Sequence, residues 1–322
     1  MVHVNVTLPG LAEFFMRHAS IEQLRFVSPL EDLVVDKYHK HIHILGEENT
    51  RSMTGVEPAR QVERSRARER LMIRELEREA AGELKWVLSL FPTQAYAQDA
   101  DMSLEEYEEF VFGACLPEPN DPIGYWKRFS AYQAGWVKWL EGKRRVRLLG
   151  RDTDLSFSIE GRPFINCDGK NNFPDGEIYT GPVEDSVNGT VRFTYPAIEA
   201  GREVENVWLR FEGGRVVEAR ADKGEDFLHK MLDTDAGARR LGEFAIGTNA
   251  GIQRFTKNIL FDEKIGGTFH LALGRSYPDS KGQNESAIHW DMVCDLRAGG
   301  EIWVDDILIH KDGTFTFDPN KS

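Results

Sequence analysis

Metal-binding types of side chain gather in residues 242–295 of this chain, inside segments that are otherwise apolar and rich in glycine. Glu243 begins an apolar run, and His270 closes the segment FDEKIGGTFH. His289 and Asp291 lie two residues apart in the sequence IHWDMV. Carboxylate oxygens and imidazole nitrogens are the ligands that divalent cations of hard or borderline character prefer in proteins. This stretch therefore predicts a divalent metal site.

A β-strand is the element that must position two of these side chains. The run around His289 and Asp291 has the composition of a strand, in which alternate side chains share a face. The two polar side chains then point to one side, while Ile288, Trp290 and Met292 point to the other. A histidine in such a strand is also an ordinary core residue in many proteins, so this pair alone leaves both interpretations open.

The density of ionisable groups in this stretch favours the metal site over an ordinary core. The segments that carry these groups look buried because they are apolar and contain many glycines. A lone buried carboxylate is costly unless it is paired or bound to a metal ion. The groups concerned are Glu243, Asp262, Glu263, His270, His289, Asp291 and Asp295.

The composition is that of a globular protein whose 322 residues suffice for two domains, with 40 basic and 53 acidic residues and a net charge of −13. A negative chain offers no net positive field to replace the counterions of nucleic acid, which argues against a nucleic-acid partner. Three cysteines, far apart in the sequence, predict a reducing compartment and no disulfide framework. No apolar run reaches transmembrane length and no signal peptide is visible, so we expect a cytoplasmic protein with no membrane partner.

Alternating strands and helices are expected in the first third of the chain. The expected strands are residues 2–8, 33–45 and 86–91, and the expected helices are residues 11–18, 21–27, 58–81 and one that follows the capping box of Ser103 and Glu106. This order indicates an α/β lobe, to which we assign residues 1–116.

Two charged features of this lobe invite over-interpretation. His39, His41 and His43 alternate along one expected strand face, but with no acidic partner in view they are more simply a polar surface. The expected helix over residues 58–81 interleaves arginines and glutamates, whose opposite charges pair at helical spacing. This helix therefore predicts a solvated face rather than a nucleic-acid patch.

A proline-rich segment at residues 116–122 marks the expected domain boundary. A helix with aromatic residues at helical spacing follows, and after Gly142 short alternating runs separated by Gly, Asn and Asp predict many strands. The chain ends in an expected hairpin that turns at Asp312 and Gly313. The predicted fold class is thus α/β, with an N-terminal α/β lobe followed by a larger β-rich α+β domain over residues 117–322.

Glu177 follows the Pro-Asp-Gly turn of FPDGEIYTGP and precedes a short apolar run, so a loop aims its carboxylate and a strand fixes it. Taken by itself, the residue is more simply part of a surface turn. Four motifs change that interpretation. FPDGEIYTGP, LGEFAIGTN, ILFDEKIGGTFHLALGRSYP and SAIHWDMVCD, in this order, resemble the thermophilic-type metalloaminopeptidases, the family of aminopeptidases T and S, of leucyl aminopeptidase type. The resemblance runs from about residue 4 to the C-terminus.

The resemblance implies an exopeptidase that removes N-terminal residues, mostly apolar ones, from peptide substrates. It implies two divalent metal ions with Tyr277 beside them as a catalytic group. The ligands that it implies are Glu177, Glu243, His270, His289 and Asp291. The family also implies a homodimer that encloses the active sites.

Three carboxylates and two imidazoles can hold two cations, and zinc, cobalt, manganese and magnesium all fit such ligands. These ions lower the pKa of a bound water and polarise the scissile carbonyl. Glu243 is the carboxylate that we expect to bridge the ions, which makes it a catalytic residue as well as a ligand. Tyr277 could donate a hydrogen bond to the oxyanion of the tetrahedral intermediate. Asp262 and Glu263 could orient His270 or relay a proton.

Two features depart from the family pattern. The chain begins inside the expected N-terminal lobe, so the resemblance implies a shortened N-terminus, and FDEKIGGTFH and GTN differ from the usual wording of aminopeptidases T and S. Two alternatives therefore stay open: another metal-dependent hydrolase on the same scaffold, such as an amidase or a dipeptidase, and a non-catalytic metal-binding protein.

Overall fold

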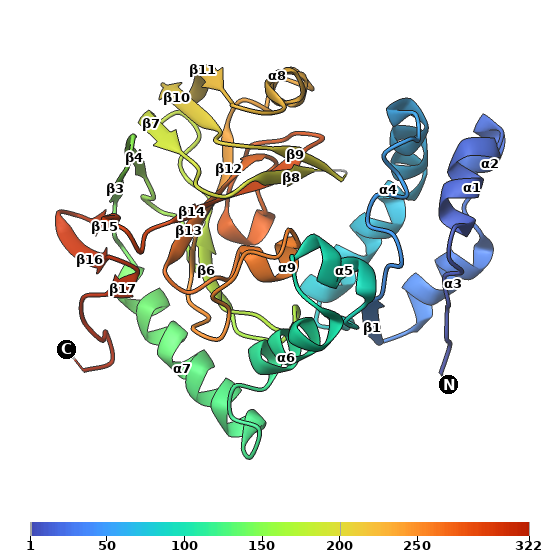
Figure 1. Cartoon of the computed structure of the whole chain (residues 1–322), viewed down its shortest axis with the longest axis horizontal. Helices are drawn as coiled ribbons and strands as arrows, with labels where there is room; N and C mark the ends of the chain where they lie inside the picture. Colours follow the sequence, from blue (N-terminus) through green and yellow to red (C-terminus); the bar gives the residue numbers. More distant parts are fainter. Residues whose placement is uncertain (1, 200, 322) are drawn as a thin grey trace.

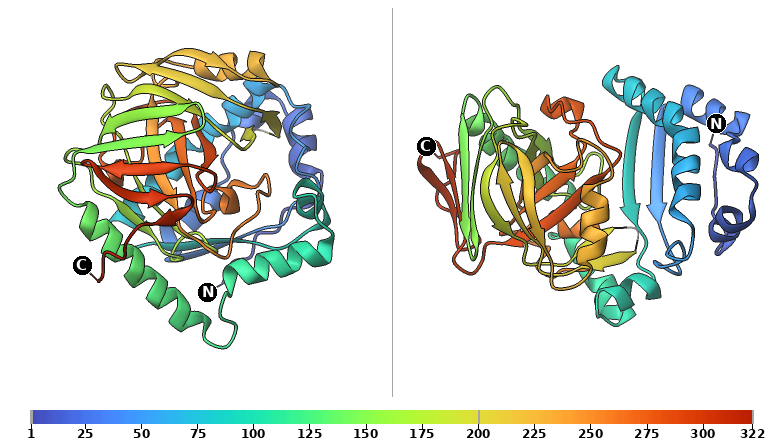
Figure 2. Two further views of the ribbon diagram at one scale, coloured as in Figure 1. Left: turned by 60° about the vertical axis from the view of Figure 1, so that its left-hand side comes forward. Right: turned by 90° about the horizontal axis from the view of Figure 1, so that it is seen from above.

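The computed structural model describes residues 2–199 and 201–321 as an N-terminal lobe of helices around two parallel strands, followed by a larger part built on two β-sheets (Figure 1). The lobe lies to one side of the sheets, as the view from above shows (Figure 2). The expected mixed α/β class, with a β-rich C-terminal region, is confirmed. No helix within the described residues is long and apolar enough to span a bilayer.

Capping residues define several helices of the lobe. Ser20, Ser28 and Ser103 each accept a hydrogen bond from the first helical turn, while a Glu or Gln three residues on bonds back to the backbone of the cap. Strands β1 (Lys40–Leu45) and β2 (Lys85–Leu90) pair in parallel, an arrangement that needs a crossover such as α4. The helices are α1 (Leu11–His18), α2 (Ile21–Arg25), α3 (Pro29–Lys37), α4 (Pro58–Ala80), α5 (Gln94–Asp99) and α6 (Leu104–Cys115).

Two of the strands expected in the lobe are wrong in whole or in part. Residues 2–8 alternate in polarity but form no strand, because within the described chain no neighbouring strand pairs with them. Only residues 40–45 of the expected strand over 33–45 are β-structure. Residues 33–37 belong instead to α3, because Ser28 and Glu31 form a capping box that favours a helical first turn.

The arginine-rich helix α4 has the solvated face that its sequence predicts, but its ion pairs run mostly to other helices. Arg70 pairs with Asp32 of α3, and Arg74 Nε lies 3.1 Å from Asp36 Oδ1. Pairing between helices replaces most of the expected pairing along one helix, because α1, α2 and α3 pack against α4.

The larger part begins with helix α7 (Pro122–Leu140) and, among described residues, contains an eight-stranded and a five-stranded sheet. The first sheet has the order β11-β10-β7-β4-β3-β15-β16-β17 and the second has the order β14-β13-β12-β6-β5. The strands of the first are β3 (Arg145–Gly150), β4 (Thr153–Ser158), β7 (Asn188–Arg192), β10 (Trp208–Glu212), β11 (Arg215–Arg220), β15 (Glu301–Val304), β16 (Ile307–Lys311) and β17 (Thr314–Phe315). Strands β16 and β17 form the expected C-terminal hairpin.

The five-stranded sheet consists of β5 (Ile165–Cys167), β6 (Glu177–Thr180), β12 (Leu241–Gly247), β13 (Thr268–Gly274) and β14 (His289–Asp295). The remaining described elements are β8 (Ala197–Glu199) and β9 (Arg202–Val204), which pair as a two-stranded sheet, the helices α8 (Glu225–Leu232) and α9 (Ile259–Asp262), and the 3-10 helix η1 (Pro278–Ser280). One face of this sheet belongs to the main apolar core, to which it contributes Ile178, Phe244, Ile246, Phe269, Leu271 and Trp290. Because strand side chains alternate, this packing leaves the opposite face for polar residues.

The lobe is joined to the ligand-bearing sheet by backbone hydrogen bonds and by a second apolar core, in which α6 packs against α9. Leu88 N donates to Asn171 O at 2.8 Å, and Phe173 N donates to Leu88 O at 2.8 Å. The segment before β6 thus pairs with β2 through a parallel bridge between Asn172 and Leu88. The domain boundary between residues 116 and 117 stays a prediction.

Candidate metal centre

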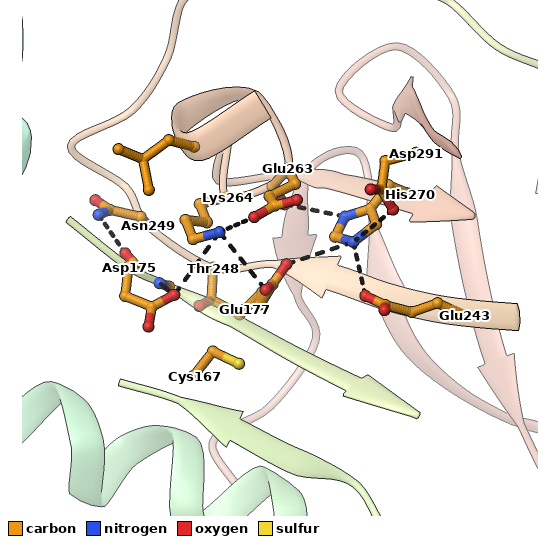
Figure 3. Close-up of polar contacts among 12 residues, drawn as sticks. Cys167, Asp175, Glu177, Glu243, Thr248, Asn249, Glu263, Lys264, His270 and Asp291 are labelled. Atoms are coloured by element: carbon orange, nitrogen blue, oxygen red, sulfur yellow. Dashed lines mark hydrogen bonds and ion pairs between the residues drawn. The ribbon is translucent and has the colours of Figure 1, made fainter. Parts of the chain in front are cut away.

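Four adjacent strands of the five-stranded sheet bring the predicted ligands together on one face. Figure 3 shows Glu177, Glu243, His270 and Asp291. The ligands and their strands are Glu177 in β6, Glu243 in β12, His270 in β13, and His289 and Asp291 in β14. Ala272 lies between Glu243 and Asp291 in the register, and Ala245 lies beside His270. These small residues on the ligand face leave room between the polar side chains.

Glu243 lies between two halves of the cluster. Its Oε1 is 3.2 Å from His270 Nε2, and its Oε2 is 3.6 Å from His289 Nε2. On the first side, Glu177 Oε2 is 3.4 Å from His270 Nε2. On the second side, Asp291 Oδ2 is 3.5 Å from His289 Nε2. Asp291 Oδ1 also lies 4.0 Å from His270 Nε2, so the two halves overlap. Each half offers one imidazole and one nearest carboxylate besides Glu243, which is common to both.

Backbone carbonyl groups orient both imidazole rings. His270 Nδ1 lies 3.1 Å from the carbonyl oxygen of Glu263, and His289 Nδ1 lies 2.7 Å from that of Arg275. Each Nδ1–H donates to its carbonyl, which leaves Nε2 facing the carboxylates. This is the arrangement by which metal-binding histidines are usually held.

Several buried oxygens of the cluster are left without hydrogen bonds. Among the described residues, Glu177 Oε2, Glu243 Oε2 and Asp291 Oδ1 are buried and have no hydrogen-bond partner. Such atoms are costly in a protein interior unless a ligand satisfies them. The ligand atoms of Glu177, Glu243 and His270 also lie within 4.8 Å of one another. These donors and their spacing fit a divalent metal ion.

Without a metal ion, the cluster keeps protons on its histidines. Burial opposes the imidazolium form, but the hydrogen bond to Glu243 and the charges of Glu177 and Asp291 raise the pKa of His270 to about 9. Against the same effect of burial, the charges of Asp291 and Glu243 raise the pKa of His289 to about 10. Burial raises the pKa of Glu243 and holds that of Glu177 well above its usual range. A metal ion that binds here must displace protons.

Tyr277 lies at the exposed side of the centre, with 44% of its surface accessible. Its ring centroid is 4.7 Å from that of His289 and 5.8 Å from that of Tyr179. Desolvation, followed by the negative charges of Glu243 and Asp291, raises the pKa of the Tyr277 hydroxyl well above its usual value. The hydroxyl therefore keeps its proton and can act as a hydrogen-bond donor.

Lys264 is a further member of the cluster, and it was not predicted from the sequence. Its fully buried Nζ pairs with Glu263 Oε1 and lies 3.6 Å from Glu177 Oε1 and 3.9 Å from Asp175 Oδ1. Burial lowers the pKa of a lysine, but here the three carboxylates outweigh burial and raise it well above its usual value. The signal available in the sequence was a basic residue inside an apolar, glycine-rich segment.

The other acidic residues of the stretch take different places. Glu263 has a carboxylate oxygen within 4.8 Å of ligand atoms of His270 and Asp291, so its side chain stands in the centre itself. Asp262 instead accepts hydrogen bonds from Thr256 N at 2.6 Å and Thr256 Oγ1 at 2.9 Å, outside the ligand cluster. Asp262 is therefore satisfied by hydrogen bonds from Thr256 and needs no metal ion to explain its burial.

Asp295 and Glu199 complete the acidic groups near these strands. Asp295 pairs with Arg297, whose Nη2 lies 2.6 Å from Asp295 Oδ2, so this residue belongs to a separate ion pair. Glu199, at the end of β8, was not assigned from sequence. Its strand β8 contacts β14. Burial and then the charge of Asp291 raise the pKa of Glu199 to about 7.

Comparison with known proteins agrees with the four motifs. The family model described as thermophilic metalloprotease (M29) matches residues 1–315. Aminopeptidase T of Thermus aquaticus is 31% identical over 258 residues, which cover 71% of this chain and 60% of that protein. Aminopeptidase 2 of Geobacillus stearothermophilus is 32% identical over 253 residues, which cover 67% of this chain and 61% of that protein. The chain therefore spans about three fifths of the length of these curated relatives.

Two solved structures share the fold. Wild-type AmpT from Thermus thermophilus matches with a TM-score of 0.81 at 25% identity, over 95% of this chain and 85% of that chain. The 2,5-dihydroxypyridine dioxygenase of Pseudomonas putida KT2440 matches with a TM-score of 0.57 at 15% identity, over 93% of this chain and 98% of that chain. At 15% identity the second likeness shows a common fold alone.

Proposed function

The chain belongs to the family of thermophilic metalloproteases (M29), and from this membership we propose that it is an aminopeptidase with two divalent metal ions at the ligand cluster. One observation carries the dinuclear proposal. The two carboxylate oxygens of Glu243 face the Nε2 atoms of two different histidines, and a second carboxylate lies within 3.5 Å of each, Glu177 at His270 and Asp291 at His289. One residue can then serve two ions.

The ligands divide between two positions in this proposal. Glu177, Glu243 and His270 would hold one ion, and Glu243, His289 and Asp291 would hold the other. When bound, divalent cations supply Lewis acidity, which makes water more acidic and polarises a peptide carbonyl. Zinc, cobalt, manganese and magnesium all suit oxygen and imidazole ligands.

The side chains of the centre have separate tasks in peptide hydrolysis. The carbonyl groups of Glu263 and Arg275 keep His270 and His289 in the orientation that binding requires. Tyr277 carries a proton that it can share with the oxyanion formed when a peptide carbonyl is attacked. A hydrogen bond that forms only in the transition state accelerates the reaction rather than tightening substrate binding.

The wider proposal concerns substrate, assembly and location. We infer peptide substrates with a free N-terminus and an apolar first residue, a homodimer and a cytoplasmic protein. The family resemblance supports the substrate and the dimer. The three cysteines of the described chain are unpaired, which supports a reducing compartment.

The test is hydrolysis of leucine p-nitroanilide by protein that has been stripped with a chelator and then given cobalt, zinc, manganese or magnesium. Activity should return with at least one metal. Glu243→Gln removes one anionic ligand that both ions would share, so it should lower kcat/KM by about a hundredfold or more, since even residues behind the ligands matter by tenfold or more. Glu69→Gln, on the exposed face of α4, is the matched control and should leave the rate unchanged.

Substrate analogues separate the alternatives. An N-acetylated leucine anilide should not be cleaved by an aminopeptidase, and its cleavage would indicate an amidase or another hydrolase. Cleavage of dipeptides alone would indicate a dipeptidase. Wild-type protein that binds metal yet cleaves none of these substrates would rule out the enzyme and leave the non-catalytic metal-binding protein.

A further inference from the structure

A buried lysine, Lys264, lies among the carboxylates of Asp175, Glu177 and Glu263, beside the candidate metal centre. Lys264 follows directly after Glu263, and its backbone is held on both sides: its N donates to Phe261 O at 3.0 Å, and its O accepts from Asn249 N at 3.1 Å. The side chain is completely inaccessible to solvent. Figure 3 shows its Nζ directed toward Asp175, Glu177 and Glu263.

The two carboxylate oxygens of Glu177 face different partners. Oε1 lies 3.6 Å from Lys264 Nζ, whereas Oε2 lies 3.4 Å from His270 Nε2 and has no hydrogen-bond partner among described residues. One oxygen is thus held by a cation that belongs to the chain. The other oxygen faces the two-histidine end, where the proposed divalent ions would bind.

Behind Lys264 lies a second group of atoms that could bind metal. Cys167 Sγ and oxygens of Asp175 and Glu177 all lie within 4.8 Å of one another. Asp175 is fixed in place by Gly169 N at 3.1 Å and Gly176 N at 3.0 Å. Burial raises the pKa of the Cys167 thiol well above its usual value, so a metal ion would have to displace its proton. The resulting thiolate and two carboxylates form a donor set that suits zinc or cobalt. Lys264 Nζ reaches both carboxylates of this set.

We propose that Lys264 is the resident cation of the Cys167–Asp175–Glu177 end and excludes a divalent ion from it, so that metal binds only at the two-histidine end. The inference deepens the proposed function, because it presupposes a metal centre at His270 and His289. Its physical basis is simple. A positive charge within 4 Å of both carboxylates offsets part of their negative charge and repels a divalent cation from the same space.

The decisive variant is Lys264→Met, which removes the charge and keeps most of the side-chain volume. Chelator-stripped protein is dialysed against cobalt, and bound metal per chain is counted while the absorption spectrum is recorded. The unchanged protein should bind two ions and show no cobalt–thiolate charge-transfer band. Lys264→Met should bind one more ion per chain and gain that band.

Two further variants assign the extra ion to its ligands. Cys167→Ser in the Lys264→Met background should remove both the band and the additional ion. Lys264→Arg keeps the charge, so it should bind the same number of metal ions as the unchanged protein. A merely structural role of the lysine would not require this result. If Lys264→Met does not fold, Lys264→Gln serves in its place, because its amide is neutral but can still donate to one carboxylate.

The outcomes distinguish this inference from the proposed function. An equal metal count and no thiolate band in both neutral variants would overturn the inference while leaving the metal centre intact. If the unchanged protein bound no divalent ion at all, the proposed function would fail first. A third ion that appeared without the thiolate band, or persisted in Cys167→Ser, would also contradict the assignment to Cys167.

Discussion

The N-terminal lobe and the ligand face of the five-stranded sheet are both dense in charge, yet they hold their charges in opposite ways. On the lobe, opposite charges meet at the surface, as Arg74 does with Asp36. On the sheet, charged groups are buried, and Glu243 and Asp291 keep oxygens without a hydrogen bond among the described residues. Charge density alone therefore does not indicate a site. Buried charge that the chain itself leaves unsatisfied does.

The two regions should differ most in how they respond to pH. In the metal-free protein the pKa values of His270 and His289 are raised to about 9 and about 10, so each metal ion must displace a proton at neutral pH. Affinity should rise with pH between 7 and 9 by about tenfold per pH unit for each displaced proton. Calorimetry in buffers of different ionisation enthalpy would count the protons released.

The same shifts predict the stability of the metal-free protein. A histidine pKa that is higher in the folded than in the unfolded state stabilises the fold below about pH 6.5, and this stabilisation is lost as pH rises toward 9 and 10. Bound metal should abolish this dependence. Metal affinity that stayed constant between pH 7 and 9 would contradict protonated histidines at the centre.

Arg78 is a buried arginine in a lobe that carries other ion pairs at its surface, and its substitution should have the next largest effect. Unlike Arg74, it is 2% exposed, and it donates to the backbone carbonyl groups of Val35 and Tyr38. Arg78→Met would leave these buried carbonyl groups without a donor and should lower the free energy of unfolding by about 3 kcal/mol. Arg74→Met, on the exposed face of the same helix, is the matched control. Urea denaturation would measure both, and equal effects would show that burial does not separate the two arginines.

A substitution of Tyr277 tests the proposed catalytic role of the buried cluster, with a smaller expected effect. Tyr277→Phe removes the hydroxyl proposed to stabilise the oxyanion and should lower kcat by about a hundredfold with little change in KM. Metal content should stay that of the unchanged protein. Tyr195→Phe removes a hydroxyl that bonds to Asp295 away from the ligands and should not affect kcat. A fall in metal content in Tyr277→Phe would make the tyrosine a support of the ligands instead.

Much of the candidate site could be predicted because strand alternation relates sequence position to direction. His289 and Asp291 were expected on one face of a strand, and β14 places them so, with Trp290 in the core on the other side. The long helix from Pro58 was also predictable, since proline suits a first helical turn. Glu177 was different. Its local sequence favoured a surface turn, and only the resemblance to a family assigned it to the cluster.

Lys264 and Asp175 could not be predicted because their role depends on how distant segments meet. Asp175 precedes β6 and Lys264 precedes β13, so only the sheet brings their charges within 3.9 Å. The expected strand over residues 2–8 failed for a related reason: alternation describes one strand, but a strand exists only where a neighbour completes its hydrogen bonds. Long-range pairing is thus what local patterns omit.

The hydrogen bonds between Leu88 and residues 171–173 make the lobe and the metal centre mechanically continuous. Asp175 lies two residues beyond this junction and Glu177 four, with an extended chain reaching only about 3.3 Å per residue. Any rotation of the lobe therefore pulls on the segment that presents both carboxylates. The position of β2 is therefore one of the constraints on where Asp175 and Glu177 stand.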